Sequence, residues 1–136
     1  MSENSVSRKE TFVFSPVDGV PPQVGPFAHA TKLGDLVFVT GQMPTDPATG
    51  EVVAGGIVEQ AEQVRANLAA VLAQFGMTFD DALQVRVYLR EFDEHFATFN
   101  DRYTTWFEGP LPARTTIGVS GLAVGALVEI DVVAGR

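Results

Sequence analysis

The segment at residues 57–76, IVEQAEQVRANLAAVLAQFG, constrains the fold of this chain more than any other. Its apolar residues recur at spacings of three and four, which is the pattern of a helix with one apolar face. Gly76, the last residue of the segment, suits a C-terminal cap. Such a helix must bury its apolar face against another element. The predicted buried face consists of Ile57, Ala61, Val64, Leu68, Val71, Leu72 and Phe75.

A matching surface follows at residues 82–90, ALQVRVYLR. Apolar and polar side chains alternate there, and this period of two predicts a strand with one apolar face. The apolar side carries Leu83, Val85, Val87 and Leu89, and the other side carries Gln84, Arg86, Tyr88 and Arg90.

Turn-forming residues divide the rest of the chain into short elements. A second helix begins near Asp93 and carries an aromatic stripe, which is typical of core packing. Residues 41–56 form a long loop rich in Gly and Pro. The other predicted strands lie at residues 11–15, 27–33, 36–40, 113–120 and 126–134.

The predicted order of elements is β-β-β-α-β-α-β-β, in a single domain that spans residues 1–136. Two amphipathic helices and a mostly antiparallel sheet favour an α+β fold, in which both helices pack on one face of the sheet. The other face is then left to water or to another subunit. Residues 1–10 are polar, and we expect them to form a flexible tail.

Composition excludes several classes of function. The formal net charge is −8, from 9 basic and 17 acidic residues, which argues against binding to a nucleic-acid backbone. The chain has no cysteine, and its histidines, His29 and His95, belong to no metal-binding motif. The sequence has no signal peptide and no run of 18 apolar residues, so we expect a cytoplasmic protein that binds neither metal nor membrane.

Arg114 opens the strand at residues 113–120, and its guanidinium stays charged, so burial would require an anion. We expect the last two strands to pair as a hairpin with a four-residue loop at residues 121–124. This register places Arg114 opposite Asp131, and Thr116 opposite Glu129, on the face that the helices leave free.

That arrangement has two interpretations. Arg114 and Asp131 could form an ordinary cross-strand salt bridge, typically worth less than about 1 kcal/mol. Alternatively, Arg114 could bind the carboxylate of a substrate and leave Glu129 to handle a proton or a water molecule. Spacing alone does not choose between them.

Several motifs, taken in order, resemble those of one family. They are GPFAHA (25–30), the pattern GQMP-DP-TGE (41–51), the pattern F-T-FND-Y (96–103), PAR (112–114) and GALVEID (125–131). Together they make the chain similar, from about residue 25 to residue 134, to the reactive intermediate deaminases of the Rid (YjgF) family.

The resemblance implies a chorismate mutase-like fold that assembles as a homotrimer around a central barrel, with a site in each cleft between subunits. Family members hydrolyse reactive enamines and imines of 2-oxo acids, such as 2-aminoacrylate and 2-iminopropanoate, to the 2-oxo acid and ammonia without a cofactor. By this resemblance Arg114 binds the substrate carboxylate and Glu129 positions or activates water. The residues that would line the site are Phe27, Thr40, Gly41, Asn100, Thr115 and Thr116.

Two positions depart from the usual family pattern. Phe27 stands where tyrosine is common, and Thr116 stands where cysteine is common. Both features are more similar to the 2-aminomuconate deaminase branch, so the substrate could be a larger aminated dienoate. A member that binds a small carboxylate without turnover is a further alternative, whereas the net charge of −8 argues against RNA cleavage.

Overall fold

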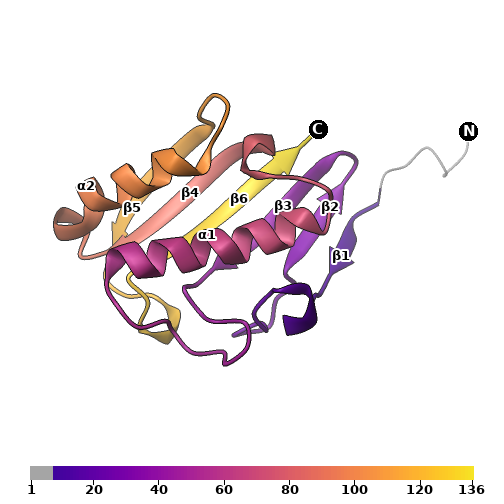
Figure 1. Ribbon diagram of the computed structural model, residues 1–136. Coiled ribbons are helices and arrows are strands. Elements are labelled where there is room, and N and C mark those ends of the chain that lie inside the picture. Colours follow the sequence, from indigo (N-terminus) through magenta and orange to yellow (C-terminus); the bar gives the residue numbers. More distant parts are fainter. Residues whose placement is uncertain (1–7) are drawn as a thin grey trace, which may run out of the picture.

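Both predicted helices form, and both pack on the same face of one six-stranded sheet (Figure 1). The structure is a computed structural model that describes residues 8–136. The order of elements is the predicted one, and the α+β fold class is confirmed. We call the sheet face that no helix covers the open face. The strands are β1 (Glu10–Phe12), β2 (Ala30–Leu33), β3 (Leu36–Gln42), β4 (Ala82–Arg90), β5 (Ala113–Val119) and β6 (Val128–Gly135), and the helices are α1 (Ile57–Ala73) and α2 (Phe92–Tyr103).

The predicted tail at residues 1–10 is too long at its C-terminal end. Glu10 already belongs to β1 and pairs with Lys32 of β2. Residues 1–7 of that tail lie outside the described part of the chain.

The first strand also ends early, because a buried histidine takes over the backbone hydrogen bonds that follow it. The amide of Phe14 donates to Nδ1 of His29 at 2.9 Å. The other ring nitrogen, Nε2, lies 2.7 Å from the carbonyl oxygen of Pro21. With both ring nitrogens bonded and the side chain buried, His29 holds the segment after β1 against the start of β2.

The strand order of the sheet is β1-β2-β3-β6-β4-β5. β5 therefore lies at an edge of the sheet, parallel to β4, and the predicted hairpin between β5 and β6 is wrong. Parallel neighbours need a crossover element, and α2 is that element between β4 and β5. Residues 120–127 then carry the chain from β5 to β6, on the other side of β4.

The core lies between the sheet and α1, as the two sequence periods predict. Leu83 is the exception: it is 51% exposed, although it was expected on the apolar side of β4. The register between β4 and β6 shifts between Ala82 and Gln84, and this irregularity removes Leu83 from the alternation. Fully buried contributors include Val64, Leu68 and Leu72 of α1, Val85, Val87 and Leu89 of β4, and Val128 and Ile130 of β6.

Two buried polar side chains of α1 fix the loops at one end of the sheet. Asn67 donates to the carbonyl oxygens of Met43 (2.9 Å) and Thr45 (2.8 Å), which follow β3. The amide oxygen of Gln60 accepts a hydrogen bond of 2.8 Å from the backbone N–H of Leu127, just before β6. Since buried amides rarely stay unpaired, these bonds hold both loops against α1.

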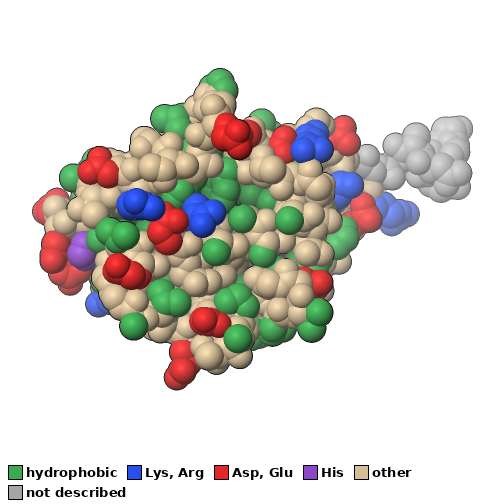
Figure 2. Space-filling model, viewed as in Figure 1, with side chains coloured by type: hydrophobic (Ala, Val, Ile, Leu, Met, Phe, Trp, Pro, Cys, Tyr) green, Lys and Arg blue, Asp and Glu red, His purple; other side chains and the backbone are tan. Residues whose placement is uncertain are grey.

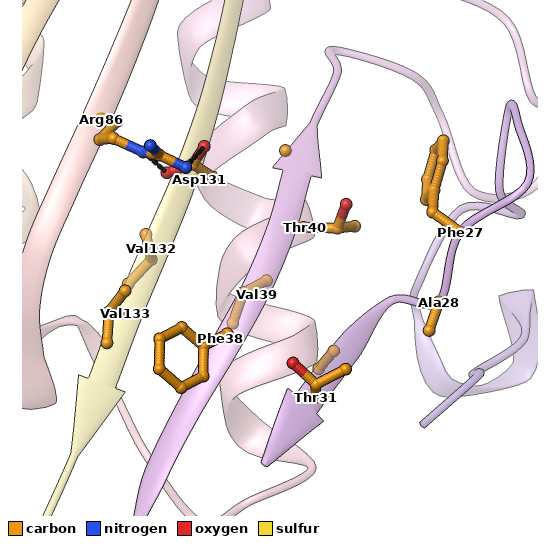
Figure 3. Close-up of a pocket in the computed structure, with 12 residues that line it drawn as sticks. Phe27, Ala28, Thr31, Phe38, Val39, Thr40, Arg86, Asp131, Val132 and Val133 are labelled. Atoms are coloured by element: carbon orange, nitrogen blue, oxygen red, sulfur yellow. Dashed lines mark hydrogen bonds and ion pairs between the residues drawn. The ribbon is translucent and has the colours of Figure 1, made fainter. Parts of the chain in front are cut away.

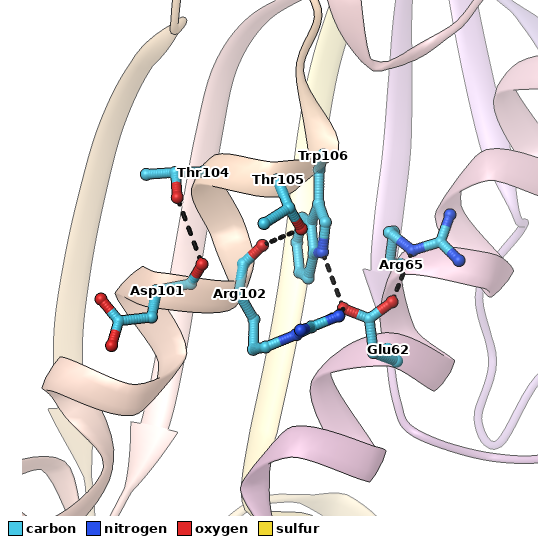
Figure 4. Close-up of polar contacts among 7 residues, drawn as sticks. All are labelled: Glu62, Arg65, Asp101, Arg102, Thr104, Thr105 and Trp106. Atoms are coloured by element: carbon cyan, nitrogen blue, oxygen red, sulfur yellow. Dashed lines mark hydrogen bonds and ion pairs between the residues drawn. The ribbon is translucent and has the colours of Figure 1, made fainter.

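A cluster around Glu62 joins the two helices (Figure 4). Its carboxylate accepts hydrogen bonds from Arg65 (2.9 Å), from Trp106 Nε1 (3.0 Å) and from both Nε and Nη2 of Arg102 (3.2 and 3.1 Å). Burial alone would raise the pKa of Glu62, but the hydrogen bonds from Trp106, Arg65 and Arg102 outweigh it and lower the pKa. The cluster fixes the C-terminal part of α2 over the sheet.

The two faces of the molecule differ in character. On the helix face, acidic and basic side chains are interspersed with apolar ones, and the basic ones form no continuous patch (Figure 2). No helix within residues 8–136 is long and apolar enough to span a membrane. The open face instead exposes apolar side chains of β2, β3 and β5, namely Leu33, Leu36, Phe38 and Ile117.

Candidate active site

The predicted arginine lies on the helix-covered face of the sheet. Arg114 is paired with Val85 of β4, whose side chain is fully buried beneath the helices. Directly paired residues of neighbouring strands point to the same face, so Arg114 projects toward α2. Thr116 is paired with the buried Val87 and projects to the same side.

The predicted acid lies on the opposite face. Glu129 alternates along β6 with Val128 and Ile130, which are fully buried under the helices, so its side chain projects from the open face. The prediction that Arg114 and Glu129 share one face is therefore wrong. It assumed that β5 pairs with β6, whereas β4 lies between them.

Side chains from one side of α2 contact the guanidinium of Arg114. Nη2 donates to the side-chain oxygen of Asn100 at 2.6 Å. The guanidinium carbon lies 4.6 Å from the ring centroid of Tyr103, 5.7 Å from that of Phe99 and 6.0 Å from that of Phe96. These α2 residues recur at helical spacing, so one stripe of the helix provides both core packing and the wall of an arginine site.

No carboxylate neutralises Arg114 within residues 8–136. The ion pairs of the described chain involve other arginines, and Asp131 is itself paired with Arg86, which contradicts the salt-bridge interpretation of Arg114. Burial lowers the pKa of Arg114, but a guanidinium keeps its proton at neutral pH. Arg114 is therefore a charged, half-buried donor group that has no anionic partner among residues 8–136.

Two buried hydroxyls belong to the same side of the sheet. Tyr103 Oη and Thr116 Oγ1 have no hydrogen-bond partner among the described residues. Burial raises the pKa of Tyr103 to about 12, so its phenol stays protonated at neutral pH and can donate. Both groups add hydrogen-bonding capacity to the region around Arg114, which is consistent with the predicted position of Thr116 in the site.

Glu129 is held against the backbone of β3. The pairing of β3 with β6 is irregular between Val39 and Gln42, and this irregularity brings Gly41 next to the Glu129 carboxylate. Burial raises the pKa of Glu129, and the neighbouring charge of Asp131 raises it further. A half-buried carboxylate with a raised pKa is suited to accept a proton from water near neutral pH.

An open cavity of about 360 Å³ lies on this side, between β2, β3 and β6 (Figure 3). It brings together three of the predicted site residues, Phe27, Thr40 and Gly41. The cavity is lined by apolar side chains such as Phe38 and, at one end, by the ion pair of Arg86 and Asp131. Thr115 is paired with Arg86 and so projects from the open face, away from Arg114.

Sequence reasoning missed the part that Arg86 plays at this cavity. Arg86 forms a bidentate pair with Asp131, with bonds of 2.8 and 3.0 Å, and the Tyr88 hydroxyl donates to the same carboxylate at 3.2 Å. The alternation along residues 82–90 did place Arg86 and Tyr88 on the side away from the helices. The β-α-β order around α2 was a second available signal, because it favours β4 rather than β6 as the neighbour of β5.

The described residues offer no obvious cation site. Within residues 8–136, no group of three or more His, Asp or Glu side chains is arranged to hold a metal ion. The donors and acceptors of the site are a guanidinium, a carboxylate, an amide and hydroxyls. These groups can bind an organic anion and move a proton.

Replacing Gly41 by alanine should reduce activity without unfolding the protein. A Cβ at this position would lie 2.9 Å from Cδ of Glu129, closer than real Cβ atoms approach, so the carboxylate must move. A displacement of this kind typically costs about 100-fold in rate. The check is the specificity constant of Gly41→Ala measured beside Gly121→Ala, since a Cβ at Gly121 meets no atom within 4 Å. Equal activities of the two variants would contradict the placement of Glu129 in the site.

Comparisons with known proteins find similarity in both sequence and fold. The family model described as endoribonuclease L-PSP matches residues 19–135. A RutC family protein of Pyrococcus abyssi is 40% identical over 114 residues, which cover 84% of this chain and 89% of that protein. A 2-iminobutanoate/2-iminopropanoate deaminase of Mus musculus is 36% identical over 114 residues, which cover 84% of each chain. The crystal structure of RidA from the Antarctic bacterium Psychrobacter sp. superimposes with a TM-score of 0.86 and 31% identity, covering 93% of this chain and 99% of that one.

These matches extend over nearly the whole domain and include both strands that carry the predicted charged site residues, β5 and β6. The likeness holds in sequence and in fold at the same time. The resemblance inferred from the motifs is confirmed, and this chain belongs to the Rid (YjgF) family.

Proposed function

We propose that this protein is a cofactor-free hydrolase that converts reactive 2-imino and 2-enamino acids, such as 2-iminopropanoate and 2-aminoacrylate, to 2-oxo acids and ammonia. The observation that carries the proposal is Arg114, a half-buried guanidinium held by Asn100 and three aromatic rings with no carboxylate partner in the described chain. A cation built into the fold in this way suits a substrate that brings its own carboxylate. The similarity to the mouse imine deaminase supports the same reaction class.

The site is composite in this proposal, because Arg114 and Glu129 project from opposite faces of one sheet. A single small substrate can meet both groups only if each comes from a different subunit. A homotrimer provides such contacts in a closed ring, where the β5 edge of one subunit meets the open face of the next. The exposed Leu33, Leu36, Phe38 and Ile117 on the open face support burial there, as expected for a subunit interface.

In the proposed reaction Arg114 binds the substrate carboxylate and thereby orients the adjacent imine carbon, which is already electrophilic. An enamine substrate first takes up a proton on carbon to become the iminium ion, which is the protonated form of the imine. Glu129 accepts a proton from water as the C–O bond forms, which gives a carbinolamine. The proton then passes to the nitrogen, the C–N bond breaks with release of ammonia, and the hydroxyl loses its proton to become the carbonyl.

A coupled assay tests the function. A serine dehydratase generates 2-aminoacrylate from serine, and pyruvate formation is followed with and without this protein. We expect faster formation of pyruvate, and Glu129→Gln should abolish the acceleration. No acceleration, together with turnover of 2-aminomuconate, would assign the protein to the larger dienoate substrates. Binding of small carboxylates without turnover of either substrate would contradict the proposal and indicate a non-catalytic member.

A further inference from the structure

We propose that Arg86 is a positioning residue of this site: by holding Asp131 in a bidentate ion pair, it leaves Glu129 as the carboxylate that exchanges protons with water. The inference rests on the proposed function, because it assigns a task to Glu129. It concerns a pair that the resemblance to the family did not point to.

The sheet register places the relevant groups side by side. Arg86 and Tyr88 of β4 lie directly opposite Asp131 and Glu129 of β6, respectively. Asp131 and Glu129 are two residues apart on one strand, so both project from the open face at neighbouring positions. Two carboxylates this close compete for one proton unless one of them is neutralised.

Arg86 provides that neutralisation in a fixed geometry. Its Nε and Nη2 reach the two oxygens of Asp131 at 2.8 and 3.0 Å, and the hydroxyl of Tyr88 adds a third hydrogen bond at 3.2 Å. Glu129 forms no ion pair within the described residues and lies against Gly41 instead. The two acids therefore differ in their partners, because Asp131 is ion-paired with Arg86 and Glu129 has no cationic partner among residues 8–136.

The charged and titratable groups around Glu129 come from its own strand, β6, and from the neighbouring strand β4. β6 contributes Asp131, and β4 contributes Arg86, Tyr88 and Arg90, whose guanidinium donates to the carbonyl oxygens of residues 125 and 126. β3, with the sequence LVFVTGQ, contributes no titratable side chain. In the proposed trimer an Arg114 guanidinium also approaches the cavity, but it is unchanged in the variants below.

The sign of the effect follows from these charges. Asp131 already raises the pKa of Glu129, after the larger effect of burial. Without Arg86 the charge of Asp131 acts on Glu129 unneutralised, so the pair takes up a proton at higher pH. Glu129 can act as a base only when it is ionised. Without Arg86, the loss of activity on the acid side of the pH profile should therefore begin at a higher pH.

The experiment compares the acid limb of the pH profile of kcat/KM in single and double variants. In Arg86→Met this limb should move up by about one pH unit. Arg86→Lys keeps the charge and should leave the limb near its original position. Arg86→Met combined with Asp131→Asn should return it to that position or below. Arg136→Met is the matched control: Arg136 and Asp81 are 60% and 19% exposed, and Arg86 and Asp131 are 57% and 17% exposed.

A purely structural role for Arg86 would lower activity by the same factor at every pH, and that result would overturn the proposal. Should Arg86→Met fail to fold, Arg86→Gln removes the same charge with a polar side chain. A second readout does not depend on catalysis: the carboxyl carbon of Glu129, assigned by NMR through Glu129→Gln, is titrated in each variant. An unchanged midpoint would refute the role of Arg86 even if the substrate has been misassigned. An upward shift without turnover would support it while refuting the proposed reaction.

Discussion

Arg114→Ala should lower kcat/KM for 2-imino acids by about 30- to 5,000-fold while the protein keeps its fold and assembly. Loss of one partner from a buried, hydrogen-bonded charge pair typically costs about 2–5 kcal/mol, and each 1.36 kcal/mol is a tenfold change in rate. In the proposed function the other partner is the substrate carboxylate, so the loss should appear in catalysis. The fold should lose less, because the Arg114 side chain makes one hydrogen bond among residues 8–136, to Asn100.

The measurement is the specificity constant, with the assembly state checked by light scattering. Arg114→Lys keeps the charge but loses the forked geometry, so its activity should fall between those of the alanine variant and the unchanged protein. Arg65→Ala serves as the control, since Arg65 is an arginine on α1 whose side chain is 40% exposed and pairs with Glu62. Retention of most activity in Arg114→Ala would exclude Arg114 as the carboxylate-binding residue.

Mixing two inactive variants should restore activity. Arg114→Ala lacks one half of the proposed site and Glu129→Gln lacks the other. If each site takes its arginine and its acid from different subunits, trimers formed from an equal mixture contain some sites with both native residues. Random assembly in a closed ring gives about a quarter of the sites this composition.

The test requires unfolding the two variants together, refolding them, and comparing the activity with that of separately refolded samples. Recovery of activity only in the joint sample would support a composite site. No recovery, in a mixture shown to contain mixed trimers, would mean that both residues act within one subunit. That result would conflict with their positions on opposite faces of the sheet.

The elements could be predicted from the sequence because each has a strong period. The helical spacing in residues 57–76 and the alternation in residues 82–90 reflect burial on one face, and α1 and β4 bury those faces. The strand order could not be predicted in the same way. Alternation determines which face a residue occupies only after its neighbour is known, and proximity in sequence favoured a β5–β6 hairpin.

The wrongly predicted β5–β6 hairpin determined how much of the site could be predicted. The cavity residues Phe27, Thr40 and Gly41 do come together, and Asn100 does contact Arg114. The shared face of Arg114 and Glu129 does not exist, because β4 separates their strands. The residues around Arg114 do not themselves indicate that β5 pairs with β4, because this pairing depends on the crossover through α2.

The aromatic stripe of α2 has a consequence for how substrate preference can change over evolutionary time. Phe99 and Tyr103 contact the guanidinium of Arg114. They are also core residues, 0% and 3% exposed, so substitutions there destabilise the domain as well as the surroundings of Arg114. Phe27 and Phe38, which line the cavity on the open face, are 38% and 43% exposed and carry far less of the core. In the proposed function, recognition of the substrate carboxylate is thus tied to the stability of the fold, whereas recognition of the rest of the substrate is free to diversify.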